Sequence, residues 1–451
     1  MRSQFGLHPN YLRNYDDLWK KMTIGGINSE LFQNLYHIKL SDLKDSRHPD
    51  AYLIRRDNPG LIVDEWGDSV DLLVHRMPFS SYDIYLDVEK EKSFFYEIYH
   101  TAAIWRLGGV SQLGYLVPQV PEGFEGKEIY YTPRIFPHSR YDHSLLVSAM
   151  AEIVLARNGF SEKERIPFVL AAACHDIATP AGGDSVMRID KKELDEEKNF
   201  SHVLKRDRLD VRWKEKYGFN LEEAQEWIEG KGIFGSLLNV LDRLAYVALD
   251  CYWFGHESKN KIRSFVSRHP LVMDVWQDIK FTENKSQFYF CDKARLYDFF
   301  VLRVLEHTEL LLNPRSRALD HTLYKNIKGL YESGEITKEL LLSRGDDVLN
   351  EIVMKLHETC PRGFFSPDKF EWRFFQSERL METFCSLNRD RISHVDQIKK
   401  FDVGFDWPVF KQGKVVEIRK VLPRRKVRKL DSIANSLKGW YVYLYKKGKE
   451  E

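Results

Sequence analysis

Two histidines and two aspartates, spread over three apolar segments, are the residue types of a metal centre. His143 opens the first segment, His175 and Asp176 close the second, and Asp242 lies in the third. Imidazole nitrogens and carboxylate oxygens together suit a first-row or hard divalent cation and leave room for water or a phosphate oxygen. The sequence therefore predicts one divalent metal ion, such as Mn²⁺, Mg²⁺, Fe²⁺ or Zn²⁺, bound by these four side chains.

The setting of Asp176 supports this prediction. The segment from Ile166 to Ile177 is nearly all apolar, which is typical of a buried helix, and it carries His175 and Asp176 near its end. Burying a carboxylate beside an imidazole costs several kcal/mol unless partners or a cation satisfy both groups. A bound metal ion is the simplest explanation for these polar residues.

Four helices are expected to position these groups. The first is predicted to be amphipathic and to end at Asn158-Gly159, and the fourth is stopped by Asn313-Pro314. The predicted helices span Ser144–Arg157, Ile166–Ile177, Leu237–Phe254 and Arg295–Leu312.

The third and fourth helices each place polar groups on one face. Asp242, Tyr246 and Asp250 are four residues apart, and Arg303 and His307 have the same spacing. Charged residues on an otherwise apolar helix need a reason, and a site between the helices supplies one. The packing stripe of the third helix is formed by Leu238, Leu241, Ala245 and Leu249.

The remaining chain is less regular. Residues 94–105 are predicted to form a helix that ends at the glycines of Arg106–Gly109, with a turn at Gln112–Gly114. Short strands are expected within residues 70–85, and further helices within residues 320–353. Residues 364–375 are rich in aromatic side chains. Two further strands are expected at residues 415–422 and 440–445.

Composition bounds the class of protein. A chain of 451 residues is expected to form two or three substructures, and a net charge of +1 argues against a dominating polyanion-binding surface. Its five scattered cysteines include no Cys-x-x-Cys pair, which argues against a disulfide scaffold or a zinc ribbon. No run approaches the roughly 18 apolar residues of a membrane span. We therefore expect a soluble, cytoplasmic protein.

Two charged runs have two interpretations each. Residues 191–198 are expected to form a solvated helix face, and a binding site is the alternative. The basic residues 424–429 are expected to form a solvated turn, with an allosteric nucleotide or oligonucleotide contact as the alternative.

The pattern of His143, His175-Asp176 and Asp242 resembles the HD-domain metal-dependent phosphohydrolases. The likeness is closest to the deoxynucleoside triphosphate triphosphohydrolases, which include dGTPase-like enzymes and the enzyme with a sterile-alpha-motif and an HD domain. Segments RYDHSL at 140–145 and DRLAYVALD at 242–250 resemble family motifs. Arg106-Leu107 with Gln112-Leu113-Gly114, and LYDFFVLR at 296–303, are similar to two others.

The resemblance implies a mainly α fold, with an HD-domain helical core and a smaller α+β C-terminal lobe. The expected divisions are residues 1–94, to which no role is assigned, the catalytic core at 95–350, and the C-terminal lobe at 351–451. The implied reaction cleaves a deoxynucleoside triphosphate to a deoxynucleoside and inorganic triphosphate.

The resemblance also implies roles for the residues around the metal. Guanidinium groups match paired phosphate oxygens, so the arginines and Tyr246 are expected to hold the phosphate chain. Asp250 is expected near the sugar 3′-hydroxyl, and Gln112 and Leu113 against the ribose. The complete predicted substrate-binding set is Arg140, Gln112, Leu113, Arg243, Tyr246, Asp250, Arg303 and His307.

One segment departs from the family pattern. There, the His-Asp pair is usually followed by Gly-His-x-Pro-Phe-x-His, whose histidines assist proton transfer. Thr179 and Asp184 occupy those positions here. His202 is similar in placement to a third family histidine, so His202 or Asp184 is predicted to be catalytic and to handle the leaving-group proton.

Two other functions remain open. The same metal centre could serve a nucleotidase, or a phosphodiesterase acting on a cyclic or modified nucleotide, and the departure after the His-Asp pair favours this version. A nucleotide sensor without catalysis would use the same pocket. The resemblance further implies a homo-oligomer with a regulatory nucleotide and a role in nucleotide-pool control or antiviral defence. No membrane partner is expected, and nucleic acid is a possible partner that the sequence does not indicate.

Overall fold

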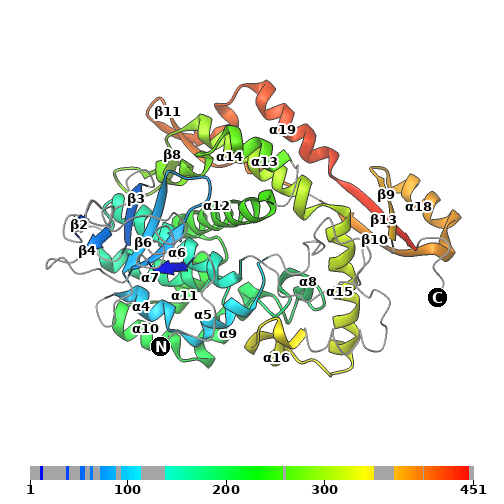
Figure 1. Ribbon diagram of the computed structural model, residues 1–451, viewed down its shortest axis with the longest axis horizontal. Helices are drawn as coiled ribbons and strands as arrows, with labels where there is room; N and C mark the ends of the chain where they lie inside the picture. Colours follow the sequence, from blue (N-terminus) through cyan, green and yellow to red (C-terminus); the bar gives the residue numbers. More distant parts are fainter. Residues whose placement is uncertain are drawn as a thin grey trace, which may run out of the picture.

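The structure is a computed structural model, shown in Figure 1. It describes residues 11–13, 37–39, 51–55, 61–63, 72–87, 93–112, 138–256, 261–349, 370–399 and 401–445. Helices predominate in this part of the chain, and smaller sheets lie before and after the helical core. The prediction of a mainly α fold with a smaller α+β C-terminal lobe is confirmed.

Three helices form the centre of the core: α6 (Arg140–Arg157), α7 (Glu162–Ala173) and α12 (Gly232–His256). A capping box fixes the start of α6, because the Ser139 side chain accepts from the Asp142 amide while the Asp142 carboxylate accepts from the Ser139 amide. Every residue of α6 from Ser144 to Ala156 is buried. The predicted amphipathic helix is therefore wrong in this respect, since α6 is surrounded by protein.

Helix α7 ends earlier than predicted. Its last residue is Ala173, and Cys174 to Ala178 form turns, so His175 and Asp176 follow the helix instead of closing it. The side chain of His175 turns back, and its Nδ1 lies 2.7 Å from the Ala172 carbonyl oxygen. The end of α7 thereby aims the other ring nitrogen of His175 away from the helix.

The predicted fourth helix is α14 (Lys293–Glu306), continued by a π-helical turn at His307–Leu311. Helix α15 (Pro314–Glu332) begins directly after Asn313, with its proline at the first position, where no backbone donor is needed. The other helices of the core are α8 (Gly183–Met187), α9 (Glu196–Arg206), α10 (Leu209–Tyr217), α11 (Leu221–Ile228), α13 (Lys261–Arg268) and α16 (Lys338–Ser343).

The helix predicted at residues 94–105 is divided in two. Helix α4 (Phe94–Tyr99) and helix α5 (Ala102–Arg106) are separated at His100-Thr101, and a 3-10 turn at Leu107–Gly109 follows. Before them, antiparallel strands pair in the order β1-β5-β6-β3, and β2 pairs with β4. These strands are Tyr11–Arg13, Leu72–Arg76, Tyr82–Asp87, Ala51–Arg55, His37–Lys39 and Leu61–Val63 respectively.

This N-terminal sheet shares the core of the helical part. Met77, Ile84 and Leu86 are fully buried and belong to the same apolar cluster as Phe95 and Leu146. The short strands predicted within residues 70–85 are confirmed as β5 and β6, although β6 continues to Asp87.

Two small sheets use strands from the second half of the chain. In one, β7 and β8, which precede α14, continue into β11 and β12 in the order β12-β11-β8-β7. In the other, β13 lies between β10 and β9 (Figure 1). The strands are β7 (Ile279–Phe281), β8 (Phe288–Phe290), β9 (Phe370–Phe375), β10 (Ile392–Ile398), β11 (Pro408–Lys411), β12 (Lys414–Glu417) and β13 (Gly439–Tyr445). Helix α18 (Glu378–Leu387) packs on β13 and β9.

Two predictions near the C-terminus are corrected. The basic residues 424–429 are not a turn but the first part of α19 (Arg424–Ser436), which buries Val427 and Leu430 and exposes the cations. The predicted strand at 415–422 is shorter, because β12 ends at Glu417 and a 3-10 turn follows. Apolar residues at helical spacing in 427–434 outweigh the local charge repulsion.

One helix in the described part of the chain is long and apolar enough to cross a membrane. Its stretch Gly232–Tyr252 has a mean hydropathy of 1.3, and 56% of the apolar window is buried inside the protein. This helix is α12, which runs through the middle of the molecule and packs against α6 and α14 (Figure 1). Its apolar character is that of a core helix.

Candidate metal centre and active site

Three predicted metal ligands converge at one point. His143 Nε2 lies 2.8 Å from Asp242 Oδ1 and 3.2 Å from His175 Nε2, and His175 Nε2 lies 3.5 Å from Asp242 Oδ1. The three residues each offer one ligand atom, and these atoms all lie within 4.8 Å of one another. The three side chains come from α6, from the turn after α7, and from α12.

These separations fit the coordination shell of a metal ion. Donor atoms at about 2.1 Å from an ion are about 3.0 Å apart at right angles and about 3.4 Å apart at tetrahedral angles. The three measured separations bracket these values. The chemistry of the donors also fits, because the short contact from His175 Nδ1 to the Ala172 carbonyl oxygen places the proton there and leaves Nε2 free to coordinate.

Asp176 lies beside the three donors. Its Oδ2 is 3.8 Å from His143 Nε2 and 3.7 Å from His175 Nε2, and it accepts a hydrogen bond of 2.9 Å from Arg140. Burial alone would raise the pKa of Asp176, but Arg140 and the two histidines hold it below its ordinary value. Asp176 is therefore an ionised neighbour that can complete the ligand set.

The electrostatics of the cluster suit a cation. Burial would raise the pKa of Asp242, but hydrogen bonds and charge from His143 and His175 keep it far below its ordinary value. Burial would lower the pKa of His175, and Asp176 together with Asp242 raises it to about 9. The carboxylates thus attract a positive charge, which is a proton on His175 in the absence of a metal ion.

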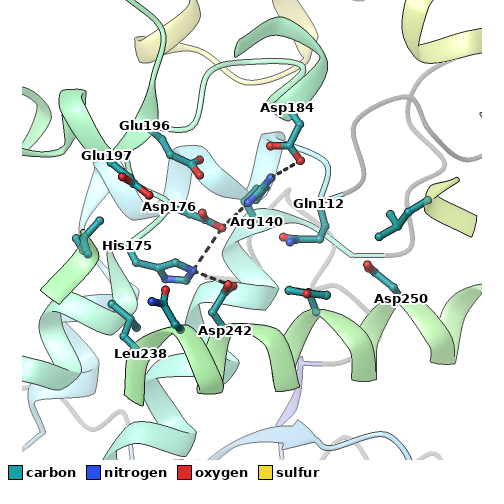
Figure 2. A pocket seen from close by; sticks show the side chains of 14 residues that line it. Gln112, Arg140, His175, Asp176, Asp184, Glu196, Glu197, Leu238, Asp242 and Asp250 are labelled. Atoms are coloured by element: carbon teal, nitrogen blue, oxygen red, sulfur yellow. Dashed lines mark hydrogen bonds and ion pairs between the residues drawn. The ribbon is translucent and has the colours of Figure 1, made fainter. Parts of the chain in front are cut away.

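A cavity of about 280 Å³ opens beside these residues. Figure 2 shows the side chains of α6, α9 and α12 turned toward this common space, with Asp242 and Asp250 projecting from α12. The lining residues are Gln112, Arg140, His175, Asp176, Asp184, Glu196, Glu197, Ile228, Leu238, Asn239, Asp242, Tyr246, Asp250 and Leu311.

Arg140 and two acids form the wall opposite α12. Arg140 Nη2 lies 3.4 Å from Asp184 Oδ2, and the Asp184 side chain is 66% exposed at the cavity mouth. Glu196 accepts a hydrogen bond of 2.5 Å from the Thr179 hydroxyl. Burial, followed by the charge of Asp176, raises the pKa of Glu196 to about 8. Glu196 therefore carries a proton at neutral pH.

The far end of the cavity is formed by Asp250 and Gln112. His138 Nε2 lies 2.8 Å from Asp250 Oδ1, although the two groups are not aligned for a hydrogen bond. Glu306 is fully buried, and neither of its carboxyl oxygens has a hydrogen-bond partner among the described residues. Burial and then the charge of Asp250 raise the pKa of Glu306 well above its ordinary value. This environment therefore favours the neutral form of Glu306.

Two other predicted substrate residues lie behind the cavity wall. Arg303 is buried, donates to the Asp402 carbonyl at 2.5 Å, and its Nε lies 3.4 Å from the Tyr246 hydroxyl. The His307 ring lies against Phe401, tilted by 33° with ring centroids 4.0 Å apart, and burial lowers the pKa of His307 to about 3. Of these, only Tyr246 lines the cavity. Arg303 contacts the site through Tyr246.

Three more predicted site residues are not among the described residues that line the cavity. The His202 side chain is half exposed, lies 3.4 Å from Glu339, and is not part of the cavity lining. Arg243 is on α12 but also lies outside the lining. Leu113 falls outside the described residues.

Glu196, Glu197, His138 and Glu306 were not predicted as site residues. The two glutamates belong to the charged run 191–198, which was expected to be solvated. A sequence signal for them exists, because Asp195 is an N-cap residue whose side chain accepts from the Lys198 amide. The first turn of α9 therefore begins at Glu196, and helix starts often face polar sites.

Comparison with known proteins identifies the fold. No protein-family model and no curated protein matches the chain. Among solved structures, a phosphohydrolase from Bacteroides thetaiotaomicron VPI-5482 aligns with a TM-score of 0.57 and 14% identity, over 83% of this chain and 99% of that one. A hypothetical protein from Aquifex aeolicus aligns with a TM-score of 0.60 and 17% identity, over 83% of this chain and 96% of the other.

At these identities the likeness shows a shared fold alone. The chain shares its fold with that phosphohydrolase, and its His-His-Asp cluster could hold a metal ion. The closer relationship to dGTPase-like enzymes stays a prediction.

Proposed function

We propose that this protein is a metal-dependent phosphohydrolase. The observation that carries the proposal is the convergence of His143, His175 and Asp242 within 4.8 Å, with Asp176 beside them. The fold shared with a phosphohydrolase supports it. A divalent ion held there would lower the pKa of a bound water and neutralise charge on a phosphoryl oxygen.

Arg140 is the phosphate-binding group of the site. Asp176 holds its Nη1, so the guanidinium is fixed in place, while its Nη2 faces the cavity mouth beside Asp184. A guanidinium fork matches two oxygens of one phosphoryl group. In this arrangement Arg140 orients the phosphoryl group against the metal ligands.

Glu196 supplies the proton for the leaving group. It lines the cavity, and its raised pKa of about 8 keeps it protonated near neutral pH. Its hydrogen bond from Thr179 fixes the orientation of the carboxyl. A positioned acid with a pKa near the working pH is an effective general acid. Asp184, at the mouth, is the second acidic group that can take part in proton transfer.

The resemblance in sequence favours a deoxynucleoside triphosphate as the substrate, with the deoxynucleoside and inorganic triphosphate as products. Asp250 and the Oε1 atom of Gln112 would then accept hydrogen bonds at the sugar. The unpaired Oε1 of Gln112 is consistent with such a ligand contact.

The charge of the cavity favours a second candidate. Among the described lining residues, six carboxyl groups face a single guanidinium, that of Arg140. A triphosphate chain would experience stronger repulsion from these acids than one phosphoryl group would. A nucleoside monophosphate or a phosphodiester is therefore the alternative substrate, and the enzyme would be a nucleotidase or phosphodiesterase.

Product analysis separates these cases. Purified protein is loaded with Mn²⁺ or Mg²⁺ and incubated with matched deoxynucleoside mono- and triphosphates, a cyclic nucleotide, and bis(p-nitrophenyl) phosphate. Inorganic triphosphate supports the first candidate, and orthophosphate or a nucleoside monophosphate supports the second. Turnover must disappear in Asp242→Asn. Nucleotide binding without turnover of any substrate would leave a sensor and contradict the proposed catalysis.

A further inference from the structure

Two loops that line the cavity are tied to one buried carboxylate, Asp346. Its Oδ2 accepts a hydrogen bond of 3.0 Å from the Ser111 amide, and its Oδ1 accepts one of 2.7 Å from the Gly182 amide. Its own amide donates to the Gly109 carbonyl at 2.7 Å. The residue is only 6% exposed, so solvent does not replace these contacts.

Both loops end in cavity residues. Ser111 precedes Gln112, which lines the far end of the cavity. Gly182 is two residues before Asp184, which pairs with Arg140 at the mouth. Asp346 thus joins the loop that carries Gln112 to the loop that carries Asp184 through the backbone, although it does not line the cavity itself.

Arg106 holds the same loop at its other end. Its Nη2 donates 2.8 Å hydrogen bonds to the carbonyls of Ile177 and Thr179, which directly follow the metal-binding pair. Its Nη1 donates to the Arg344 carbonyl at 3.0 Å. The loop between Ile177 and Gly182 is therefore fixed at both ends to the segment that contains Asp346.

Two glycines make this arrangement possible. A Cβ on Gly345 would lie 2.8 Å from the Gly109 carbonyl oxygen and 2.9 Å from its carbon atoms. The two backbones touch, and only glycine permits this approach. Residues 345–346 are thereby held against the loop that leads to Gln112.

We propose that Asp346 is a positioning residue, which sets the distance between the Gln112 and Asp184 walls of the cavity and so the placement of the phosphoryl substrate. This proposal rests on the proposed phosphohydrolase function. Partners of this kind, one layer removed from the reacting groups, typically change activity by about 10–100-fold when they are mutated.

Asp346→Asn is the test variant. The amide keeps the shape of the side chain but offers one acceptor and one donor group, so it can serve only one of the two amide N–H groups. The metal ligands are not altered. We expect one bound Mn²⁺ as in the wild type, and a fall of about 10-fold or more in kcat/KM, mainly through KM, because substrate placement is disturbed.

Asp274→Asn is a matched control for loss of stability. Asp274 is also 6% exposed, and it holds the turn at Ser80-Ser81 through the Ser81 amide at 2.8 Å and two hydroxyls. None of these hydrogen-bond partners lines the cavity. We expect a similar loss in the thermal unfolding midpoint but an unchanged kcat/KM per folded molecule.

Two outcomes would overturn the proposal. One is an Asp346→Asn protein with wild-type kcat/KM, and the other is an equal loss of kcat/KM in both variants. If the wild type hydrolyses no substrate, the proposed function fails, and the affinity of the Mn²⁺-loaded proteins for orthophosphate replaces turnover as the measurement. An affinity about 10-fold weaker in Asp346→Asn alone supports positioning, and equal affinities contradict it.

Discussion

Replacing Glu196 by glutamine tests the assignment of the general acid. Glutamine keeps the size of the side chain and a contact with Thr179, but it has no proton to transfer. With the pKa of Glu196 raised to about 8, roughly 90% of the groups are protonated at pH 7 and roughly 10% at pH 9. A positioned acid contributes on the order of 100-fold or more to the rate. We therefore expect kcat at pH 7 to fall about 100-fold in Glu196→Gln.

The pH profile gives the sharper comparison. Wild-type kcat should fall tenfold per pH unit above about pH 8, and a bound cation would move this limb to lower pH. The variant should lack the limb, so its deficit should shrink about tenfold between pH 7 and pH 9. Glu193→Gln, in the same charged run but paired with Lys338 outside the cavity, serves as the control. A variant that keeps the wild-type alkaline limb would refute the role of Glu196.

Two further predictions concern protons in the site. Without a metal ion the pKa of His175 is raised to about 9, so a proton competes with the ion for this side chain. The apparent affinity for Mn²⁺ should therefore rise about tenfold per pH unit from pH 7 to 9 and then level off. Calorimetric titrations in which the affinity does not depend on pH would contradict this prediction. Burial and then Asp250 raise the folded-state pKa of Glu306 well above its ordinary value, so its contribution to stability is present below that ordinary value and is lost as pH rises. Urea unfolding at pH 5 and pH 8 should show Glu306→Gln becoming more stable relative to wild type at the higher pH, and a pH-independent difference would mean that the pKa of Glu306 is not raised in the folded protein.

The grouping of His143, His175 and Asp242 could be predicted from sequence because each residue lies in an apolar helix or just after one. His143 lies in the first turn after the Ser139 cap, and His175 follows the apolar residues of α7. Few alternatives exist for imidazoles and carboxylates beside buried helices, since unpaired charge is costly there. The helical core was predictable for the same reason, from long apolar periodicity.

The contacts of residues that support the cavity without lining it could not be predicted from the local sequence pattern. Arg303 was expected at the phosphates, but its contact with the Asp402 carbonyl depends on a segment almost 100 residues later in the chain. Asp346 contacts Ser111 and Gly182 across even longer separations. Such contacts are set by tertiary packing, which propensity and spacing do not encode.

The charged run at 191–198 shows a different limit. Composition predicts a solvated face, and Lys198 is indeed 63% exposed. Glu196 nevertheless lines the cavity: Asp195 caps helix α9, and Glu196 is its first helical residue. Composition alone does not show which glutamate of such a run faces the cavity.

Metal content tests the central claim most directly. Full-length protein loaded with Mn²⁺ and freed of excess ion should contain about one ion per chain, measured by mass spectrometry, and Asp176→Ala and Asp242→Ala should lose it. Asp250→Asn, two turns further along α12, should retain it. The same stoichiometry in wild type and Asp242→Ala, with both proteins folded, would contradict the metal centre on which this account depends.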